Sequence, residues 1–265
     1  MSQLRRCGWQ YFLERIVRTP SRPSVPAVAG QVVHTGTEQV DRLLHTGQTD
    51  PRVLLQAAST DADAAVQAAI VEKSAAGWEP SKWKAFGRAT AEKPFGEDLQ
   101  WFQAQGIPQS LVAYVEWRME TMWTLAEIPH FGAAIEVPFV YYTNSGNQVH
   151  GWIDRVFVID GELVLLDIKS GQKPKTSEQL GLYAAALRNG LGWNVTTGYF
   201  LYGLKHGEAK LTKPLDLTVW SDERLSRLYD MSSQAIEAGI YLPNPGEACW
   251  SCSVSQHCEF SQAAI

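Results

Sequence analysis

Two apolar runs on either side of Asp160-Gly161 constrain the fold of this chain more than any other feature of its sequence. The runs at 149–159 (VHGWIDRVFVI) and 163–170 (LVLLDIKS) are rich in β-branched and aromatic residues, which favour β-strands. An Asp-Gly pair between such runs indicates a β-hairpin, because the type I′ turn needs positive φ at both central residues. The sequence therefore predicts an antiparallel hairpin with a two-residue turn.

The register of this hairpin places two carboxylates beside each other in an apolar sheet. Asp154 lies opposite Asp167, and Lys169 points to the same face as Asp167. Like charges at opposed positions destabilise a sheet, and a divalent cation with oxygen ligands would supply the missing counter-charge. Two alternatives stay open. Asp154 pairs with Arg155 or Lys169 at the end of the sheet, or a one-residue slip puts the carboxylates on opposite faces.

The neighbouring segments predict an α/β fold with a mixed central sheet. A strand at 135–142 (IEVPFVYY) precedes the hairpin, and a helix capped by Thr176 or Ser177 follows it. A further strand is expected at 195–204. The order β-β-β-α-β, with helices before it, is typical of an α/β sandwich. Before the strands, helical patterning extends over 28–46 and over much of 50–130, including 111–128. A loop is expected at 77–98.

We expect one domain over the whole chain, because 265 residues are enough for one large core. Its parts are an N-terminal segment with the first cysteine, an inserted helical region, the strand-rich core, and a C-terminal helix with further cysteines. These parts cover 1–27, 28–130, 131–205 and 206–265.

Composition and charge narrow the class of protein. Hydrophobic residues make up 45% of the chain and charged residues 19%, which is ordinary for a globular enzyme. The net charge of −5 excludes a protein that coats nucleic acid through uniform positive charge, although it is compatible with a local basic groove. No apolar run approaches the ~18–20 residues that span a bilayer, and no signal peptide is evident. We therefore expect a cytoplasmic protein without a membrane partner.

The four cysteines are grouped in a way that predicts metal binding. Cys7 lies near the N-terminus, and Cys249, Cys252 and Cys258 form a C-x2-C-x5-C pattern near the other end. In a reducing compartment, clustered thiols are more often metal ligands than disulfides. Four thiolates suit either zinc or an iron–sulfur cluster, and their spacing does not choose between them. Unrelated cysteines are the remaining alternative. A bound metal would join the two ends of the chain.

The order of these motifs resembles the RecB-type nuclease branch of the PD-(D/E)XK superfamily, which implies a restriction-endonuclease-like core. The motifs that carry the resemblance are Gly30-x3-His34-x3-Glu38, Gly151-Trp-Ile-Asp154, Asp167-Ile-Lys169 and Gln179-x3-Tyr183. The cysteines on either side resemble the iron-staple subset of CRISPR-associated, AddB-type and phage exonucleases. Because the first motif lies almost at residue 1, we expect no helicase domain before it, which argues against a full RecB or AddB subunit.

The resemblance implies a role for each residue of these motifs. Lys169 would position or activate the attacking water and stabilise the charge that develops on the phosphate. Gln179 and Tyr183, one helical turn apart, would help to position the DNA strand. The ligands of Mg²⁺ or Mn²⁺ would be the side chains of His34, Asp154 and Asp167 and the backbone carbonyl of Ile168. The ligands of a structural 4Fe–4S cluster would be Cys7, Cys249, Cys252 and Cys258.

The function implied by the resemblance is that of a metal-dependent DNA exonuclease that prefers single-stranded ends. Its setting would be recombination, DNA processing or CRISPR adaptation, in a phage or a bacterium, with a protein of one of these systems as a partner. The main alternative is a non-catalytic DNA-end-binding protein with the same fold, against which the intact Asp154, Asp167 and Lys169 argue. An α/β hydrolase or a P-loop phosphatase lacks support, because neither G-x-S-x-G nor a phosphate-binding P-loop is present.

Overall fold

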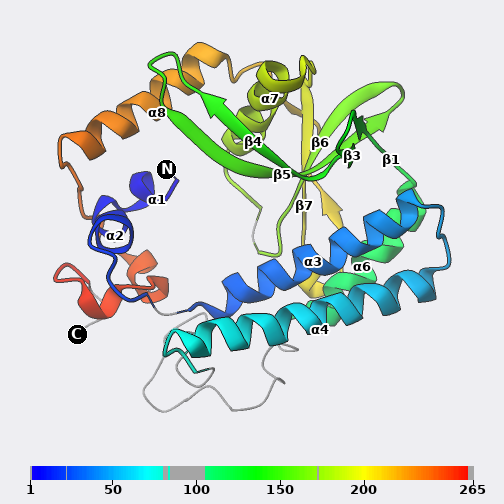
Figure 1. The fold of residues 1–265 in the computed structure, drawn as a ribbon, viewed down its shortest axis with the longest axis horizontal. Coiled ribbons are helices and arrows are strands. Elements are labelled where there is room, and N and C mark those ends of the chain that lie inside the picture. The colour runs from blue at the N-terminus through cyan, green and yellow to red at the C-terminus, as the bar shows by residue number, and fades with distance from the viewer. Residues whose placement is uncertain (1, 22, 80–82, 84–104, 172, 262–265) are drawn as a thin grey trace. The chain divides into compact units, whose positions relative to one another are not determined.

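The hairpin predicted around Asp160-Gly161 lies in the middle of a seven-stranded mixed sheet in this computed structural model (Figure 1). The structure describes residues 2–21, 23–79, 83, 105–171 and 173–261. These residues belong to two units. Unit 1 comprises Met1–Val28, Gln67–Phe102 and Arg227–Ile265, and unit 2 comprises Ala29–Val66 and Gln103–Ser226. The sheet belongs to unit 2, and the expectation of a single domain stays a prediction.

The hairpin has the register that its turn predicts. Strands β5 (Gln148–Ile159) and β6 (Glu162–Ile168) are antiparallel, and Ile159 pairs with Glu162 next to the turn. Asp160 and Gly161 have φ values of 53° and 85°, as the turn requires. The slipped register is therefore wrong.

The rest of the sheet follows the predicted order. Strand β4 (Ile135–Tyr142) is antiparallel to β5, and β7 (Thr197–Tyr202) is parallel to β6 after helix α7 (Glu178–Leu191). One antiparallel and one parallel neighbour make the sheet mixed, which confirms the predicted fold class. The short strands are β1 (Thr124–Leu125), β8 (Lys210–Leu211) and β9 (Leu215–Asp216) in this sheet, with β2 (Glu127–Ile128) and β3 (Gly132–Ala133) as a separate pair.

Helices cover both faces of the sheet (Figure 1). Val156 of β5 packs with Leu180 and Leu187 of α7 in one core cluster. The next residue, Phe157, points to the other face, where the Arg118 guanidinium lies 4.9 Å from its ring centre. The other long helices are α3 (Val25–His45), α4 (Pro51–Ala75), α6 (Ile107–Thr121) and α8 (Asp222–Glu237). Among the described residues, no helix is both long enough and apolar enough to cross a membrane.

Two details of the helices differ from the predictions. The helical pattern expected through residue 128 ends at Thr121, because Met122 has a left-handed φ of 48° and the chain then pairs as strands. Ser177 precedes α7 as one of the two expected caps, but its side chain makes no capping hydrogen bond and instead accepts one from Trp220 at 2.9 Å. Most of the loop expected at 77–98 lies outside the described residues.

Within unit 1, the two ends of the chain lie together. The Gly8 N–H donates to the Leu242 carbonyl at 2.9 Å, and the Asn244 side chain donates to the Arg6 carbonyl at the same distance. A Cβ atom on Gly8 would lie 2.7 Å from the Leu242 backbone nitrogen, so this approach requires glycine. The short helices involved are α1 (Ser2–Arg6), α2 (Gly8–Tyr11), the π-helix η1 (Phe12–Ile16), and the 3-10 helices η4 (Glu247–Ser251) and η5 (Ser255–His257).

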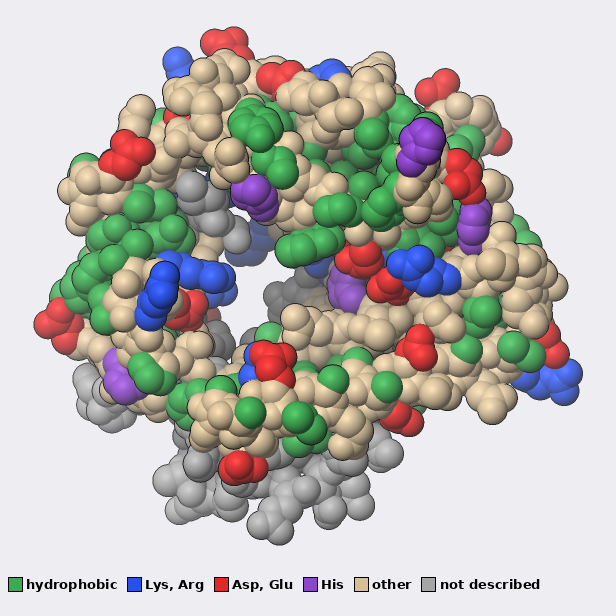
Figure 2. Space-filling view, viewed as in Figure 1, with side chains coloured by type: hydrophobic (Ala, Val, Ile, Leu, Met, Phe, Trp, Pro, Cys, Tyr) green, Lys and Arg blue, Asp and Glu red, His purple; other side chains and the backbone are tan. Residues whose placement is uncertain are grey.

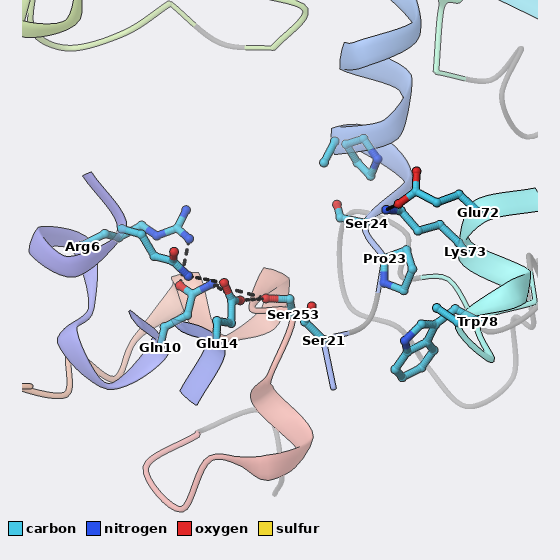
Figure 3. A pocket seen from close by; sticks show the side chains of 14 residues that line it. Arg6, Gln10, Glu14, Ser21, Pro23, Ser24, Glu72, Lys73, Trp78 and Ser253 are labelled. Atoms are coloured by element: carbon cyan, nitrogen blue, oxygen red, sulfur yellow. Dashed lines mark hydrogen bonds and ion pairs between the residues drawn. The ribbon is translucent and has the colours of Figure 1, made fainter. Parts of the chain in front are cut away.

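A polar cavity of about 810 Å³ also lies within unit 1 (Figure 3). On one side, Arg6 donates to Gln10, and Glu14 accepts hydrogen bonds from Gln10 and Ser253. On the other side, near the end of α4, Lys73 pairs with the adjacent Glu72 at 2.5 Å. Each acid in this cavity is therefore engaged by a neighbouring side chain.

A buried ionic network joins α3 and α6 to the sheet within unit 2. Asp41 accepts hydrogen bonds from Tyr114 at 2.5 Å, Arg118 at 2.7 Å and Arg155 at 2.6 Å. All four side chains are buried, and the proximity of Asp41 outweighs burial and raises the pKa of Arg155. Burial, followed by the charge of Asp41, raises the pKa of Tyr114. The network therefore holds its charges in fixed positions.

Asp41→Asn should destabilise the protein by about 3–5 kcal/mol, because it leaves two buried guanidinium groups without their shared carboxylate. Glu38→Gln on the same helix is the control, because it removes only the surface pair with Arg42 and should cost at most about 0.5 kcal/mol. The free energies of unfolding, measured in urea by circular dichroism, should therefore differ several-fold. Equal losses in the two variants would show that the buried network has no special role in stability.

Candidate active site

One acidic residue of β4 and one of β5 lie at the same level of the sheet. The pairs Ile135–Arg155 and Val137–Ile153 lie on either side of Glu136 and Asp154, which are therefore opposite each other. The hairpin register, continued by one residue beyond its last pair, then places Asp167 of β6 opposite Asp154. The sequence predicted the second of these pairs.

The regular alternation of β5 is interrupted at this level. Ile153 and Val156 both pack in the core cluster under α7, although an ordinary strand would point them to opposite faces. The partner residue Glu136 has a φ of 47°, a left-handed conformation that is strained for a residue with a side chain. The backbone is thus distorted where the acidic residues meet, and such distortions are typical of functional sites.

His34 of α3 completes a group of possible metal ligands. One ligand atom from each of His34, Glu136 and Asp154 lies within 4.8 Å of the other two. His34 Nδ1 is 3.7 Å from both carboxylates, and its Nε2 is 3.0 Å from the Ile168 carbonyl oxygen. Burial by itself would lower the pKa of His34, but Glu136 and Asp154 outweigh this effect and raise it. The structure therefore brings together three of the four predicted ligands: His34, Asp154 and Ile168.

The carboxylates in this group differ in how they are held. The Ile168 N–H donates to Asp154 Oδ2 at 2.7 Å, which fixes this side chain against β6. Glu136 accepts a hydrogen bond from Arg155 at 3.0 Å. Burial would raise the pKa of Glu136, but His34 and Arg155 together lower it. Both side chains are thus positioned before any cation binds.

Asp167, the fourth predicted ligand, lies next to this group but is not part of it. Its carboxylate is fully buried, and Lys169 Nζ lies 2.6 Å from Oδ2, an ion-pair distance. Neither oxygen has a hydrogen-bonding partner of good geometry among the described residues. Burial, followed by the nearby charge of Asp154, raises the pKa of Asp167 to about 7. An unsatisfied, buried carboxylate next to another acid is the environment that a divalent cation stabilises.

Lys169 continues from Asp167 into a chain of hydrogen bonds that reaches α7. Its ammonium group donates to Gln179 at 3.0 Å, and Gln179 donates to the Tyr183 hydroxyl at 2.5 Å. Burial, followed by the charges of Asp167 and Asp154, raises the pKa of Tyr183. The predicted pair on α7 therefore lies beside the acidic residues and contacts Lys169 directly.

The N-terminal motif reaches this site through His34 alone. A Cβ atom on Gly30 would lie 3.0 Å from the Ser170 hydroxyl, so glycine lets α3 approach the end of β6 closely. Further along the helix, Glu38 forms a partly exposed pair with Arg42 at 2.6 Å. Figure 2 shows a group of acidic, histidine and basic side chains along the side of α3 that faces the strands.

The site residue that sequence reasoning missed is Glu136. It is the one acid in the apolar strand segment IEVPFVYY, and that was the available signal. Placing it opposite Asp154 requires the register of the β4–β5 hairpin, whose pairing resumes at Tyr142–Gln148 across a turn of five residues. The turn at Thr143–Asn147 contains several turn-forming residues and does not fix a register as Asp160-Gly161 does.

This set of donors can hold a divalent cation. Imidazole, carboxylate and carbonyl oxygen are ligands of Mg²⁺, Mn²⁺ and later metals. The two unsatisfied Asp167 oxygens provide further donor atoms beside the group formed by His34, Glu136 and Asp154. The arrangement therefore suits metal-assisted chemistry on a negatively charged group, with Lys169 as an additional cation.

The four cysteines line one cavity within unit 1, together with Gln10 and Asn244. None of the four thiols is in a disulfide, and all four residues are partly buried. Burial, followed by the neighbouring thiols of Cys7 and Cys249, raises the pKa of Cys258. No three of these sulfur atoms, all within the described part of the chain, lie within 4.8 Å of one another. The structure thus brings the predicted ligands together around one space without forming a closed group.

The mixed sheet flanked by helices, with adjacent aspartates on neighbouring strands and a lysine two residues beyond the second, defines a restriction-endonuclease-like α/β core. The family profile described as the PD-(D/E)XK nuclease superfamily matches residues 1–259. The chain therefore belongs to the PD-(D/E)XK nuclease superfamily. This superfamily is one of nucleases, and the group formed by His34, Glu136 and Asp154 offers donor atoms for a divalent metal.

Two phage proteins are similar to part of this chain. The Gene 69 protein of Mycobacterium phage L5 is 38% identical over 130 residues, which are 47% of this chain and 44% of that protein. The Gene 69 protein of Mycobacterium phage D29 is 36% identical over 149 residues, which are 55% of each. The matches thus span about half the length of these curated relatives.

Asp167→Ala should leave the metal-free protein as stable as the wild type or more so, because it removes a buried charge that has no good hydrogen bond. Asp154→Ala is the matched comparison. It leaves the Ile168 N–H without its acceptor, and should therefore destabilise the protein by about 1–3 kcal/mol. Melting temperatures in EDTA give the order. A lower melting temperature for Asp167→Ala than for Asp154→Ala would contradict this account of the two carboxylates.

Proposed function

We propose that the protein is a metal-dependent DNA exonuclease of the RecB type that acts preferentially on single-stranded ends. The observation that carries the proposal is the buried, unsatisfied Asp167 beside Asp154, with Lys169 2.6 Å from the Asp167 carboxylate. Superfamily membership supports hydrolysis of phosphodiester bonds. The preference for single-stranded ends rests on the resemblance of the motifs and of the flanking cysteines to the iron-staple exonucleases.

In this proposal, Mg²⁺ or Mn²⁺ is held by His34, Asp154, Asp167 and the Ile168 carbonyl, with Glu136 as an additional ligand or as the acceptor that orients His34. A metal bound there would polarise a phosphate oxygen and acidify a bound water. His34 can offer its Nε2 atom as a ligand only after its contact with the Ile168 carbonyl is released. Through Nδ1, which lies 3.7 Å from the Glu136 and Asp154 carboxylates, His34 could join these acids as a ligand without that change.

Lys169 supplies positive charge where the phosphate becomes more negative. Its ammonium group lies between the Asp167 carboxylate and the Gln179 side chain, so its position is fixed from two sides. Tyr183 in turn holds Gln179. A pre-positioned cation of this kind stabilises a transition state without the cost of reorganisation. We therefore assign Lys169 to catalysis, and Gln179 and Tyr183 to positioning Lys169 and the DNA strand.

Asp167→Ala should abolish cleavage, because the metal loses a ligand and its water is no longer activated. Lys169→Ala should keep the metal and lose about 10²–10³-fold in rate, because only the stabilisation of transition-state charge is removed. The measurement is shortening of end-labelled single-stranded DNA in Mn²⁺ or Mg²⁺, with EDTA as the control. Lys205→Ala, which removes a lysine outside the site, should cut at the wild-type rate.

Three results would count against the proposal. Wild-type protein that binds DNA ends but never shortens them in either metal would favour the non-catalytic end-binding protein. Wild-type cleavage by Asp167→Ala would show that the site is built on other residues. Equal cleavage of internal sites in closed circular DNA would replace the exonuclease with an endonuclease.

We further propose that the four cysteines ligate a structural 4Fe–4S cluster. The support is that residues about 240 positions apart line one cavity, where the chain ends are already joined by backbone and side-chain hydrogen bonds. Tetrahedral zinc would place its sulfur ligands about 3.8 Å apart, given Zn–S bonds of about 2.3 Å. No three of these sulfur atoms, all in the described part of the chain, lie within 4.8 Å of one another, so the thiols would have to move closer to bind zinc in this way. A recombination or CRISPR adaptation protein is the proposed partner.

Cys258→Ala should lose iron and lower the melting temperature, because a cluster that joins the chain ends restricts the unfolded chain. The measurements are iron content, visible absorbance and thermal unfolding of protein purified without oxygen. Ser253→Ala is the control, since it removes a hydrogen bond to Glu14 in the same segment without touching a thiol, and it should keep its iron. Wild-type protein that holds zinc and no iron would overturn the cluster assignment.

A further inference from the structure

The β4–β5 hairpin presents a face that carries aromatic side chains exposed to solvent. From the pair Val137–Ile153 to the turn, exposed residues alternate along both strands with buried or partly buried ones. The exposed pairs are Pro138–Trp152, Val140–His150 and Tyr142–Gln148. The exposed fraction is 63% for Trp152 and 58% for Tyr142. No ring from the described residues stacks on either of them. We call this surface the outer hairpin face.

The opposite face of the same hairpin packs against helices. Phe139 lies edge to face against Tyr183 of α7, with ring centres 5.5 Å apart, and the Tyr141 hydroxyl bonds to Ser226 at 3.2 Å. The aromatic residues of the outer hairpin face therefore contribute little to the core. Large aromatic groups that remain exposed beside an active site are typical of binding surfaces.

The outer hairpin face continues directly into the metal-binding group. Glu136 and Asp154 lie two residues along the strands from Pro138–Trp152. They are opposite each other, between the pairs Val137–Ile153 and Ile135–Arg155. These carboxylates meet His34 of α3, and α3 lies on the side of the sheet away from α7 (Figure 1). Figure 2 shows hydrophobic side chains exposed over this hairpin and, next to them, acidic and histidine side chains. From Gln148 to Asp154 the extended strand covers about 20 Å.

The chemistry of the outer hairpin face suits unpaired bases. Its six side chains include two aromatic rings, an imidazole and no acid, so nothing on it repels a phosphate backbone. Bases stack on aromatic side chains irrespective of sequence, whereas paired bases in a duplex do not expose their faces. Pro138 lacks a backbone N–H in the edge strand β4, which disfavours a second copy of the chain that would add a strand there.

We propose that a single strand of DNA lies along the outer hairpin face, with its bases stacked on Trp152 and Tyr142 and its end directed to the carboxylates. This inference rests on the proposed nuclease function and adds the part of the protein that would select unpaired strands. Trp152, two residues before Asp154, is the ring nearest to the cleavage site along the strand. Tyr142, at the far end of the face, contacts bases that are more distant from the cleavage site.

The first test measures stacking directly, apart from catalysis. Oligonucleotides carrying fluorescent 2-aminopurine are titrated with protein in EDTA, because stacking on a ring quenches this base. Trp152→Ala should weaken binding of single strands by about tenfold, and Trp152→Leu should do the same because it keeps apolar area but removes the ring. Trp152→Phe should restore most of the affinity. Met122→Ala, which removes another exposed apolar side chain from unit 2, should have no effect.

A strand with abasic sites provides the complementary probe. It keeps the phosphates but has no bases to stack, so wild type and Trp152→Ala should bind it equally and weakly. Cleavage in Mn²⁺ should show the same pattern, with Trp152→Ala and Tyr142→Ala losing their preference for single strands over duplex ends. Wild-type affinity in Trp152→Ala, or full affinity of the wild type for the abasic strand, would overturn the proposal.

Failure of this proposal and failure of the nuclease function give different results. Wild-type protein that quenches 2-aminopurine but never cuts DNA would disprove the nuclease and leave the stacking face intact. A variant with both Trp152→Ala and Tyr142→Ala that cuts single strands as well as the wild type would disprove the stacking face alone. If the Trp152→Ala substitution changes only self-association, as measured by sedimentation, then the outer hairpin face binds a second copy of the chain. That result would overturn the proposal.

Discussion

The arrangement of the site depends on the contacts that the Arg155 guanidinium makes. It is fully buried and contacts the Asp41 carboxylate, the Glu136 carboxylate and the Asp154 carbonyl. One side chain thus connects α3, β4 and the backbone of β5 at the level of the acidic residues. A charge placed so deeply persists only because it is paired, here with two carboxylates, since leaving it unpaired costs several kcal/mol. The backbone distortion around Glu136 and Asp154 therefore has a rigid support.

This network also explains how so many acids coexist in a small region. Asp41 faces two guanidinium groups, and Glu136 shares Arg155 with it. These acids are neutralised by the protein itself. Asp167 has only the partly exposed Lys169 as a cation, and it is the carboxylate whose oxygens lack good partners. Among these acids, Asp167 therefore has the least compensating positive charge, and a cation would be expected beside it.

Sequence reasoning succeeded where a local signal fixed the geometry. The Asp160-Gly161 turn determines the hairpin register, and this register alone is enough to place Asp154 beside Asp167. Runs rich in β-branched and aromatic residues, bounded by turn residues, indicated the strands. These features depend on neighbours in the sequence or on a turn of two residues, so they can be predicted without knowledge of the tertiary fold. The expectation that Gln179 and Tyr183 lie beside the site came instead from the resemblance of the motifs.

The features that were missed depend on contacts between distant segments. Asp41 lies in a segment that the sequence predicts as a helix, but Tyr114, Arg118 and Arg155 approach it only after folding. Glu136 required the register of a five-residue turn. The exposed Trp152 lies inside a motif interpreted through Asp154, and only the burial pattern of the paired strands separates its outward position from that of Ile153. Within one short motif, then, alternation assigns a core residue, the proposed metal ligand and a surface ring to neighbouring positions, which brings the proposed binding face and the proposed catalytic carboxylate onto the same strand.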